Sequence, residues 1–182
     1  MLRAIDVANF FITLFENLED DNDLTNMKIN KLLYYSQGHC YERLGRPLFN
    51  DSIEAWVNGP VVNGVYQNLK QYDKCVIPST IGDFDLTKFS DDESELLLDI
   101  AREYGKYSAG TLRNMTHIQG GPWDNYYVGA YHTVIPQDAI ARHFMEGEKL
   151  SSFCLPEDVE VVGRVESDCL IISKEDFDDW DY

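Results

Sequence analysis

Two regions of the sequence contain residue types and spacings that could do chemistry. His117 lies shortly before the sequence GGPWD at residues 120–124, and a histidine beside a turn and a carboxylate could act as a general base. The run 19–23 is dense in carboxylates, which calcium prefers as ligands, but it lacks the spacing of an EF-hand loop. Neither region matches an established site, so we predict no metal site and no cofactor.

The rest of the sequence adds no catalytic motif. No serine or cysteine lies in a nucleophile motif, no glycine-rich phosphate loop follows a strand, and the other histidines lack carboxylates at zinc-site spacing. We therefore expect His117 to end a helix and donate to a backbone carbonyl, while Trp123 fills the core. An enzyme that uses His117 with Asp124 or a nearby tyrosine is the less favoured alternative, and no catalytic residue is assigned.

The net charge limits the classes of partner. With 15 basic and 32 acidic residues the formal charge is −17, which argues against binding nucleic acid through a basic face. The acidic surface either serves solubility alone, or attracts a basic protein or imitates a nucleic acid. No apolar run approaches the roughly 20 residues that cross a bilayer, and no signal peptide is recognised. We expect a cytoplasmic protein without membrane contact, whose separated cysteines are reduced.

The elements that would position these residues surround a central helix, predicted between Thr25 and Gly45. Thr25 can cap the first turn, Gly45 can adopt the left-handed conformation, and Pro47 follows where the helix cannot continue. Apolar and aromatic residues occupy most sides of this helix, as in a buried one. Lys28 and Lys31 share one edge, where we expect them to neutralise local carboxylates; the alternative is that they face a partner.

Periodicity and capping signals predict the remaining elements. Further helices are expected over residues 4–18, 61–72, 90–105, 108–117 and 136–147. A short strand at 53–57 is followed by the breaking sequence Asn58-Gly59-Pro60, in which Pro60 suits the first turn of the next helix. A hairpin is expected at 159–172. The predicted fold class is mainly α with a small β element (α+β): a compact helical domain, residues 1–148, with a short antiparallel sheet or hairpin, followed by an acidic C-terminal extension, residues 149–182.

Ordered motifs along residues 4–144 carry a family resemblance. They are KLLYY (31–35), GRPLF (45–49), IEAW (53–56), GPVV (59–62) followed by VY, LRNMTH (112–117), PW (122–123) and IP (135–136) leading to Phe144. Together they resemble the Panacea domain, the SocA-like antitoxin family, which includes phage-associated proteins and is related to the genetic-element protein GepA. Asn58 and the pair Asn63-Gly64 depart from the family pattern. The motif residues expected to be structural are Lys28, Lys31, Leu32, Leu33, Tyr34, Tyr35, Pro47, Leu48, Phe49, Trp56, His117, Pro122 and Trp123.

The resemblance implies an interaction protein rather than an enzyme. It implies the antitoxin of a type II toxin–antitoxin system, which neutralises a cognate toxin by direct binding and, in one family member, also presents the toxin to a Clp-type protease. Because many toxins act on nucleic acids, we expect the toxin to be basic. The alternative is a phage or mobile-element inhibitor that blocks a host nucleic-acid-binding defence effector through an acidic, DNA-like surface.

Two segments are candidates for contacting the partner. The turn at 58–61 is either a recognition turn or, as we favour, a tight connection. From residue 157 onward ten acidic residues face two basic ones, and aromatic residues interrupt them; this segment is either a docking element or a solvated terminus. The candidate partner-binding residues are Asn58, Gly59, Pro60, Val61, Tyr66, Asp176, Phe177, Asp179 and Trp180.

Overall fold

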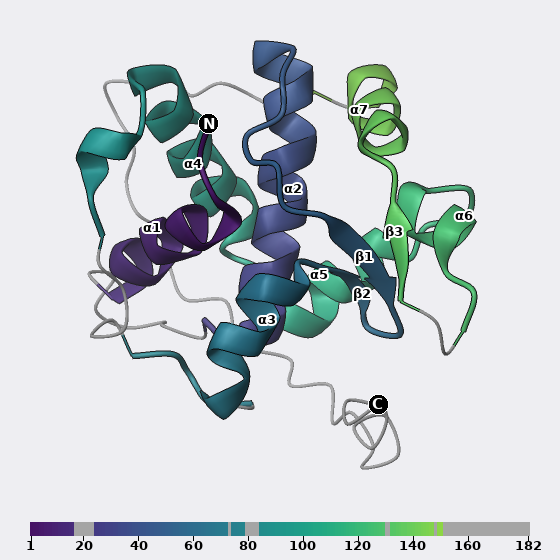
Figure 1. Ribbon diagram of the computed structural model, residues 1–182, viewed down its shortest axis with the longest axis horizontal. Helices are drawn as coiled ribbons and strands as arrows, with labels where there is room; N and C mark the ends of the chain where they lie inside the picture. The colour runs from purple at the N-terminus through teal and green to yellow at the C-terminus, as the bar shows by residue number, and fades with distance from the viewer. Residues whose placement is uncertain (17–23, 73, 79–83, 130–131, 148, 151–182) are drawn as a thin grey trace. The chain divides into compact units, whose positions relative to one another are not determined.

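The computed structural model describes residues 1–16, 24–72, 74–78, 84–129, 132–147 and 149–150 (Figure 1). These residues form a mainly α-helical domain with one small antiparallel sheet, so the predicted fold class is confirmed. The acidic run 19–23, the predicted hairpin at 159–172 and the acidic C-terminal residues lie outside the described residues. None of the described helices combines the length and the apolar character that crossing a bilayer requires.

Helix α2, Asn26–Leu44, is the centre of the domain, and both predicted ends are confirmed. The Thr25 side chain accepts a hydrogen bond from the Lys28 backbone N–H, and Gly45 adopts φ 66° while its N–H bonds to the Tyr41 carbonyl. The other helices are α1 Ala4–Glu16, α3 Asn63–Leu69, α4 Asp91–Tyr104, α5 Ala109–Thr116, α6 Pro122–Tyr126 and α7 Gln137–Glu146, with 3₁₀ turns at Lys70–Tyr72 and Leu86–Lys88. Of these helices, all but α6 pack against α2, and α6 packs against strand β3, Thr133–Ile135, and α7 (Figure 1).

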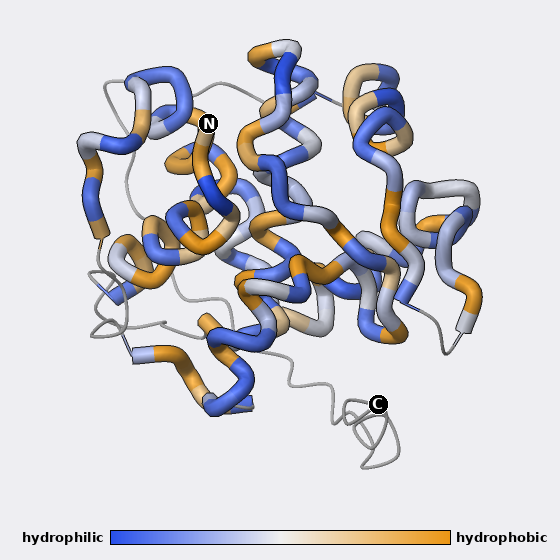
Figure 2. Tube along the Cα trace, viewed as in Figure 1, coloured by the Kyte–Doolittle hydropathy of each residue, from blue (hydrophilic) through white to orange (hydrophobic). Residues whose placement is uncertain are grey.

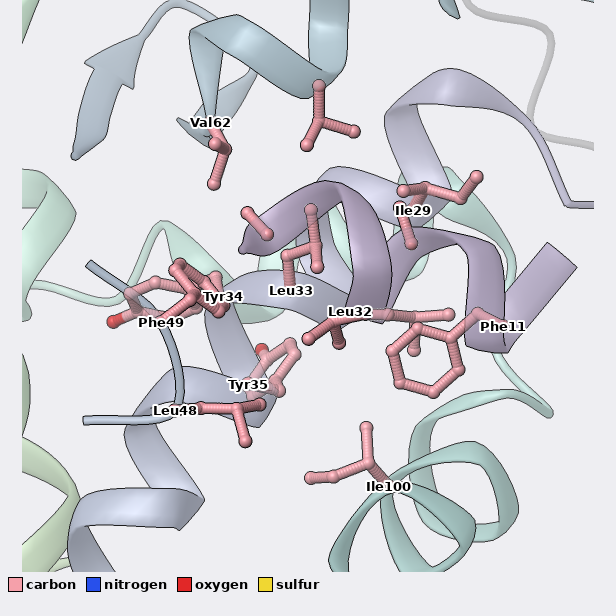
Figure 3. Close-up of a cluster of buried hydrophobic side chains, with 14 of the residues drawn as sticks. Phe11, Ile29, Leu32, Leu33, Tyr34, Tyr35, Leu48, Phe49, Val62 and Ile100 are labelled. Carbon is pink, nitrogen blue, oxygen red and sulfur yellow. The ribbon is translucent and has the colours of Figure 1, made fainter. Parts of the chain in front are cut away.

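One hydrophobic core joins α2 to its neighbours. Figure 3 shows Phe11 of α1 and Ile100 of α4 packed near Leu32 of α2, while Leu48 and Phe49 reach the same cluster from the segment after α2. Each of these five side chains is fully buried. Burying a side chain of this size contributes roughly 1.5–3 kcal/mol, so the motif residues Leu48 and Phe49 hold an otherwise irregular segment against the helix.

Helix α2 also buries polar residues, which its apolar character did not predict. Hydrophilic and hydrophobic positions are interspersed along it (Figure 2), yet Asn26, Asn30, Lys31 and Gln37 are each at most 3% exposed. Buried polar groups are costly unless hydrogen-bonded. Each of these side chains bonds to the main chain of a neighbouring segment.

The sheet has the strand order β2-β1-β3, with both pairs antiparallel. Strand β1, Ile53–Trp56, pairs with β2, Gly59–Val61, through a two-residue loop, and with β3, Thr133–Ile135. The prediction that Pro60 opens a helix is therefore wrong, because Pro60 lies opposite Ala55 and α3 begins only at Asn63. Strand β3 was not predicted, since three residues are too short to show alternation and their pairing is supplied by β1, nearly 80 positions earlier in the chain.

Capping and ion pairs fix the outer helices. Ser90 and Glu93 form the predicted capping box at the start of α4, and Arg46 donates to the Glu93 carboxylate at 2.9 Å. The buried carboxylate of Asp99 pairs with Arg43 of α2 and with Arg102, each at 2.8 Å. These contacts join α4 to α2 and to the turn that follows α2.

Candidate functional site

Both ring nitrogens of His117 lie near backbone carbonyl oxygens. His117 follows the last residue of α5, and its Nδ1 lies 2.6 Å from the Arg113 carbonyl oxygen, while Nε2 lies 3.3 Å from the Val57 carbonyl oxygen. Burial lowers its pKa, so the ring is neutral at pH 7 and the shorter contact assigns the proton to Nδ1. Asp124 is exposed and accepts from the Gly120 backbone N–H. The predicted structural role of His117 thus agrees with its contacts.

Trp123 contacts the same part of the chain as His117, the end of β1. Its Nε1–H donates to the Trp56 carbonyl at 2.7 Å, and its ring centroid lies 3.6 Å from that of His117. With 8% of its surface exposed, it belongs to the core, as expected. His117, after α5, and Trp123, in α6, therefore contact the backbone at the end of β1.

The burial of Lys31, close to these residues, was not expected from the sequence. Lys31 is fully buried, and its Nζ donates to the Pro60 carbonyl at 3.0 Å. Burial, together with the smaller effect of the nearby charge of Arg113, lowers its pKa to about 7. Gly59 has φ 98°, and a Cβ added there would lie 2.8 Å from both Lys31 Cε and Thr116 Oγ1. A larger residue at position 59 would collide with these atoms, so the buried position of Lys31 requires glycine there.

Lys28 and Lys31 are both buried, which their spacing on α2 did not predict. Lys28 is 1% exposed, donates to the Gly105 carbonyl at 2.7 Å and lies 5.3 Å from the centre of the Phe15 ring. Helix periodicity identifies residues on one face but not what covers that face. Here the β1–β2 hairpin and α5 cover Lys31, and the end of α4 covers Lys28.

Two amides of α2 hold further motif segments, and sequence reasoning missed both. Asn30 Oδ1 accepts from the Val62 N–H at 2.9 Å. Gln37 Oε1 accepts from the Leu48 and Phe49 N–H groups at 3.0 and 3.2 Å, and its Nε2 donates to the Phe49 carbonyl at 3.1 Å. The presence of Asn30 and Gln37 in a helix that is otherwise apolar could have indicated that their side chains bind buried backbone groups. The motifs GRPLF and GPVV are therefore docked by their backbones onto one helix.

The described candidates for partner binding are buried. Asn58 is 5% exposed, Tyr66 is 4% exposed, and Gly59, Pro60 and Val61 are buried in β2. This burial favours the tight connection over the recognition turn. The other candidates, Asp176, Phe177, Asp179 and Trp180, lie outside the described residues.

A half-open cavity of about 180 Å³ lies between α2, α4, α5 and α7. We call it the aromatic pocket, because aromatic rings from three of these helices form its walls. Its lining residues are Tyr34, Tyr35, His39, Tyr104, Met115, Thr116, Ile118, His143, Phe144 and Gly147. Of these, the sequence had singled out Tyr34 and Tyr35 as structural motif residues only. The pocket itself arises from four helices that are separated in the chain.

Comparisons with known proteins agree with the motif positions. The family model described as "Antitoxin SocA-like, Panacea domain" matches residues 29–124, from α2 to α6. Antitoxin SocA of Caulobacter vibrioides (strain NA1000 / CB15N) is 30% identical over 113 residues, which are 57% of this chain and 60% of that relative. No solved structure matches the chain. Because the family model covers more than half of its residues, this protein belongs to the SocA-like Panacea domain family of antitoxins.

Proposed function

We propose that this protein is an antitoxin that neutralises a toxin protein by direct binding. The observation that carries the proposal is the family match over residues 29–124, supported by the similarity to a relative named Antitoxin SocA. The matched region spans 60% of the length of that relative. The match covers a scaffold in which α2 fixes the backbones of the GRPLF and GPVV segments through Gln37, Asn30 and Lys31.

The proposal includes that the protein acts without catalysis. The single histidine that invited an enzymatic interpretation, His117, directs both ring nitrogens at backbone carbonyls. Lys31, whose lowered pKa would suit a nucleophilic amine, is fully buried against Pro60 and Gly59. These contacts support structural roles for both residues.

The charge supports a basic toxin as the partner. A formal charge of −17 attracts a basic protein at long range and raises the rate of encounter, while buried contacts determine the lifetime of the complex. Presentation of the bound toxin to a Clp-type protease is the finer form of the proposal, taken from the family resemblance.

A toxicity rescue tests the proposal. The neighbouring small open reading frame is expressed alone, together with this protein, and together with the Leu32→Asp variant, which places a charge in the core and serves as an unfolded control. We expect growth arrest from the neighbour alone, rescue by the wild type and no rescue by the control. A toxic neighbour that this protein neither binds nor neutralises would contradict direct neutralisation.

Toxin abundance separates the two forms of the proposal. Neutralisation by binding alone leaves the amount of toxin unchanged during rescue. Adaptor action lowers it, and deletion of the Clp-type protease restores both toxin level and toxicity. Rescue that persists with undiminished toxin in cells with the protease would contradict the adaptor form while leaving direct neutralisation in place.

A further inference from the structure

Two tyrosines, Tyr34 and Tyr35, line the aromatic pocket. Tyr34 and Tyr35 are only 3% and 6% exposed, and neither hydroxyl has a hydrogen-bond partner in the part of the chain that the structure describes. Burial raises the pKa of both, so they are neutral at pH 7. Both hydroxyl oxygens are accessible to solvent, since the fully buried side-chain atoms without a partner among the described residues do not include them. Both side chains line the pocket, so a polar group entering it can satisfy them.

The walls of the pocket are flat and well fixed. Tyr35 stacks on Tyr104 with ring centroids 4.0 Å apart and an interplanar angle of 14°, and Phe144 packs edge-on against Tyr34 at 5.5 Å. His39 holds the Tyr104 hydroxyl at 2.8 Å. Such faces favour a further aromatic ring, which adds roughly 0.5–1.5 kcal/mol beyond the area it buries.

The lining favours an uncharged occupant. It contains no carboxylate, and its two histidines, His39 and His143, have pKa values lowered by burial, that of His39 to about 4. Arg43 also lowers the pKa of His39, while the Glu42 carboxylate lies 3.6 Å from His39 Nδ1, outside the lining. Because no carboxylate lines the pocket itself, a cation in it would lose its water without a direct counter-ion. An aromatic ring with a neutral polar group meets no such penalty.

Size and position point to a side chain rather than a whole ligand. A cavity of about 150 Å³ holds one benzene, whereas sites for drug-sized ligands take about 300–1,000 Å³. At about 180 Å³ the aromatic pocket accommodates one ring with a small substituent. Its exposed lining residues, Ile118 and Gly147, place its opening at the protein surface. Tyrosine and tryptophan anchors that enter such pockets dominate many protein interfaces.

We propose that the aromatic pocket receives an uncharged aromatic side chain with a hydrogen-bonding tip, a tyrosine by size, from the bound partner protein. The proposal rests on the proposed function for the identity of the partner, which is the toxin. It assigns a recognition role to Tyr34 and Tyr35, whose rings pack in the core while their hydroxyls remain available to the occupant.

The chemistry of the pocket is tested with p-cresol, the analogue of a tyrosine side chain, added to the full chain and followed by NMR titration. We expect a dissociation constant in the millimolar range, toluene to bind at least fivefold more weakly, and methylguanidinium not to bind. In the double variant Tyr34→Phe, Tyr35→Phe, p-cresol should lose its advantage over toluene. The matched variant Tyr126→Phe, in α6 and outside the pocket, should keep it. Equal binding of toluene and p-cresol to the wild type, or tighter binding of methylguanidinium, overturns the proposal.

The source of the occupant is tested with a plugged pocket. Ile118→Trp places a large ring at the opening, and Val128→Trp adds the same ring at a residue that is 61% exposed and does not line the pocket. We expect the first variant, but not the second, to lose p-cresol binding and to weaken toxin binding at least tenfold. Loss of p-cresol binding with unchanged toxin binding overturns the assignment to a partner side chain. The p-cresol measurement needs no toxin, so its result stands whether or not the antitoxin proposal does.

Discussion

At the scale of single residues, the domain depends on a few positions where one side chain or one missing side chain decides the packing. Gly38 lies in the middle of α2, where glycine is usually unfavourable, and the Phe144 ring of α7 occupies the space that a Cβ would fill. Lys31 is a buried amine that pairs with no carboxylate of the described residues. Gly38 is unfavourable within a helix and a buried amine is costly, but each allows a contact between elements that are distant in the chain.

Replacing Gly38 with alanine should destabilise the protein by about 1–3 kcal/mol, because the added Cβ collides with the Phe144 ring and the gain in helix propensity offsets only part of this strain. Urea unfolding measures the loss. Gly64→Ala is the matched control: it lies in α3 with open space around it and should be neutral or slightly stabilising. Combining Gly38→Ala with Phe144→Leu should cost less than the sum of the two single changes. A Gly38→Ala protein as stable as the wild type would refute this account of the α2–α7 contact.

The buried Lys31 should make stability rise with pH. Its folded pKa of about 7 lies below its unfolded value near 10.5, so between these values only the unfolded chain binds the proton. The penalty for burying the amine is fully present below pH 7 and disappears as the pH approaches 10.5. We expect the free energy of unfolding of the wild type to increase by about 1–3 kcal/mol between pH 7 and 9, relative to Lys31→Met, which cannot titrate. Urea unfolding of both proteins at each pH gives the difference, and parallel pH profiles would contradict the assignment.

At the scale of elements, α2 acts as a template for backbone segments that have little regular structure. Gln37 binds the N–H groups of Leu48 and Phe49, Asn30 binds that of Val62, and Lys31 binds the Pro60 carbonyl. Satisfying backbone groups in this way allows the segment after α2 and the β1–β2 hairpin to lie in the interior. This explains why the family motifs fall on α2 and on the segments that it binds.

Gln37→Leu should therefore cost about 2–5 kcal/mol, because the side chain keeps its size while the Leu48 and Phe49 N–H groups lose their acceptor. Urea unfolding should show the loss, and hydrogen exchange should show faster exchange at these two amides. Gln67→Leu is the control, since Gln67 is exposed on α3 and bonds only within its own helix; it should change stability by less than about 0.5 kcal/mol. Unchanged exchange at Leu48 and Phe49 would show that Gln37 does not hold this segment.

At the scale of the whole molecule, the most pronounced feature of the composition is the formal net charge of −17. Within the described residues several acids are already engaged: Asp6 pairs with Arg3 and Lys88, and Asp99 pairs with Arg43 and Arg102. The Asp6–Lys88 and Asp99–Arg43 pairs join different elements, and in all four pairs the basic group offsets the charge of the carboxylate. The excess negative charge is what a basic partner meets first.

Association with a basic toxin should accordingly depend on salt. Raising NaCl from 50 to 300 mM should lower the association rate constant by about tenfold, while the dissociation rate, set by buried contacts, changes little. Stopped-flow or biosensor kinetics on the purified pair separate the two constants. An association rate that does not change with salt would show that the acidic surface serves solubility rather than encounter.

The sequence by itself determined the parts of this protein that depend on neighbours in the chain. The ends of α2 at Thr25 and Gly45 and the capping box at Ser90 follow from local hydrogen bonding, and the structure confirms them. The mainly α fold class, the burial of α2 and the family also followed, because amphipathic periodicity and ordered motifs are properties of the linear sequence. The contact of His117 with a backbone carbonyl was predictable for the same reason, since its partner Arg113 lies one helical turn away.

Only the tertiary structure decided what depends on residues distant in the chain. Strand β3 exists because β1 offers it a partner, and Lys31 is buried because the hairpin and α5 cover it. The aromatic pocket likewise needs Tyr35, Tyr104 and Phe144 to meet from three helices. No local pattern encodes such meetings, because they depend on how whole faces pack together, and the free energy of that packing is shared among many residues.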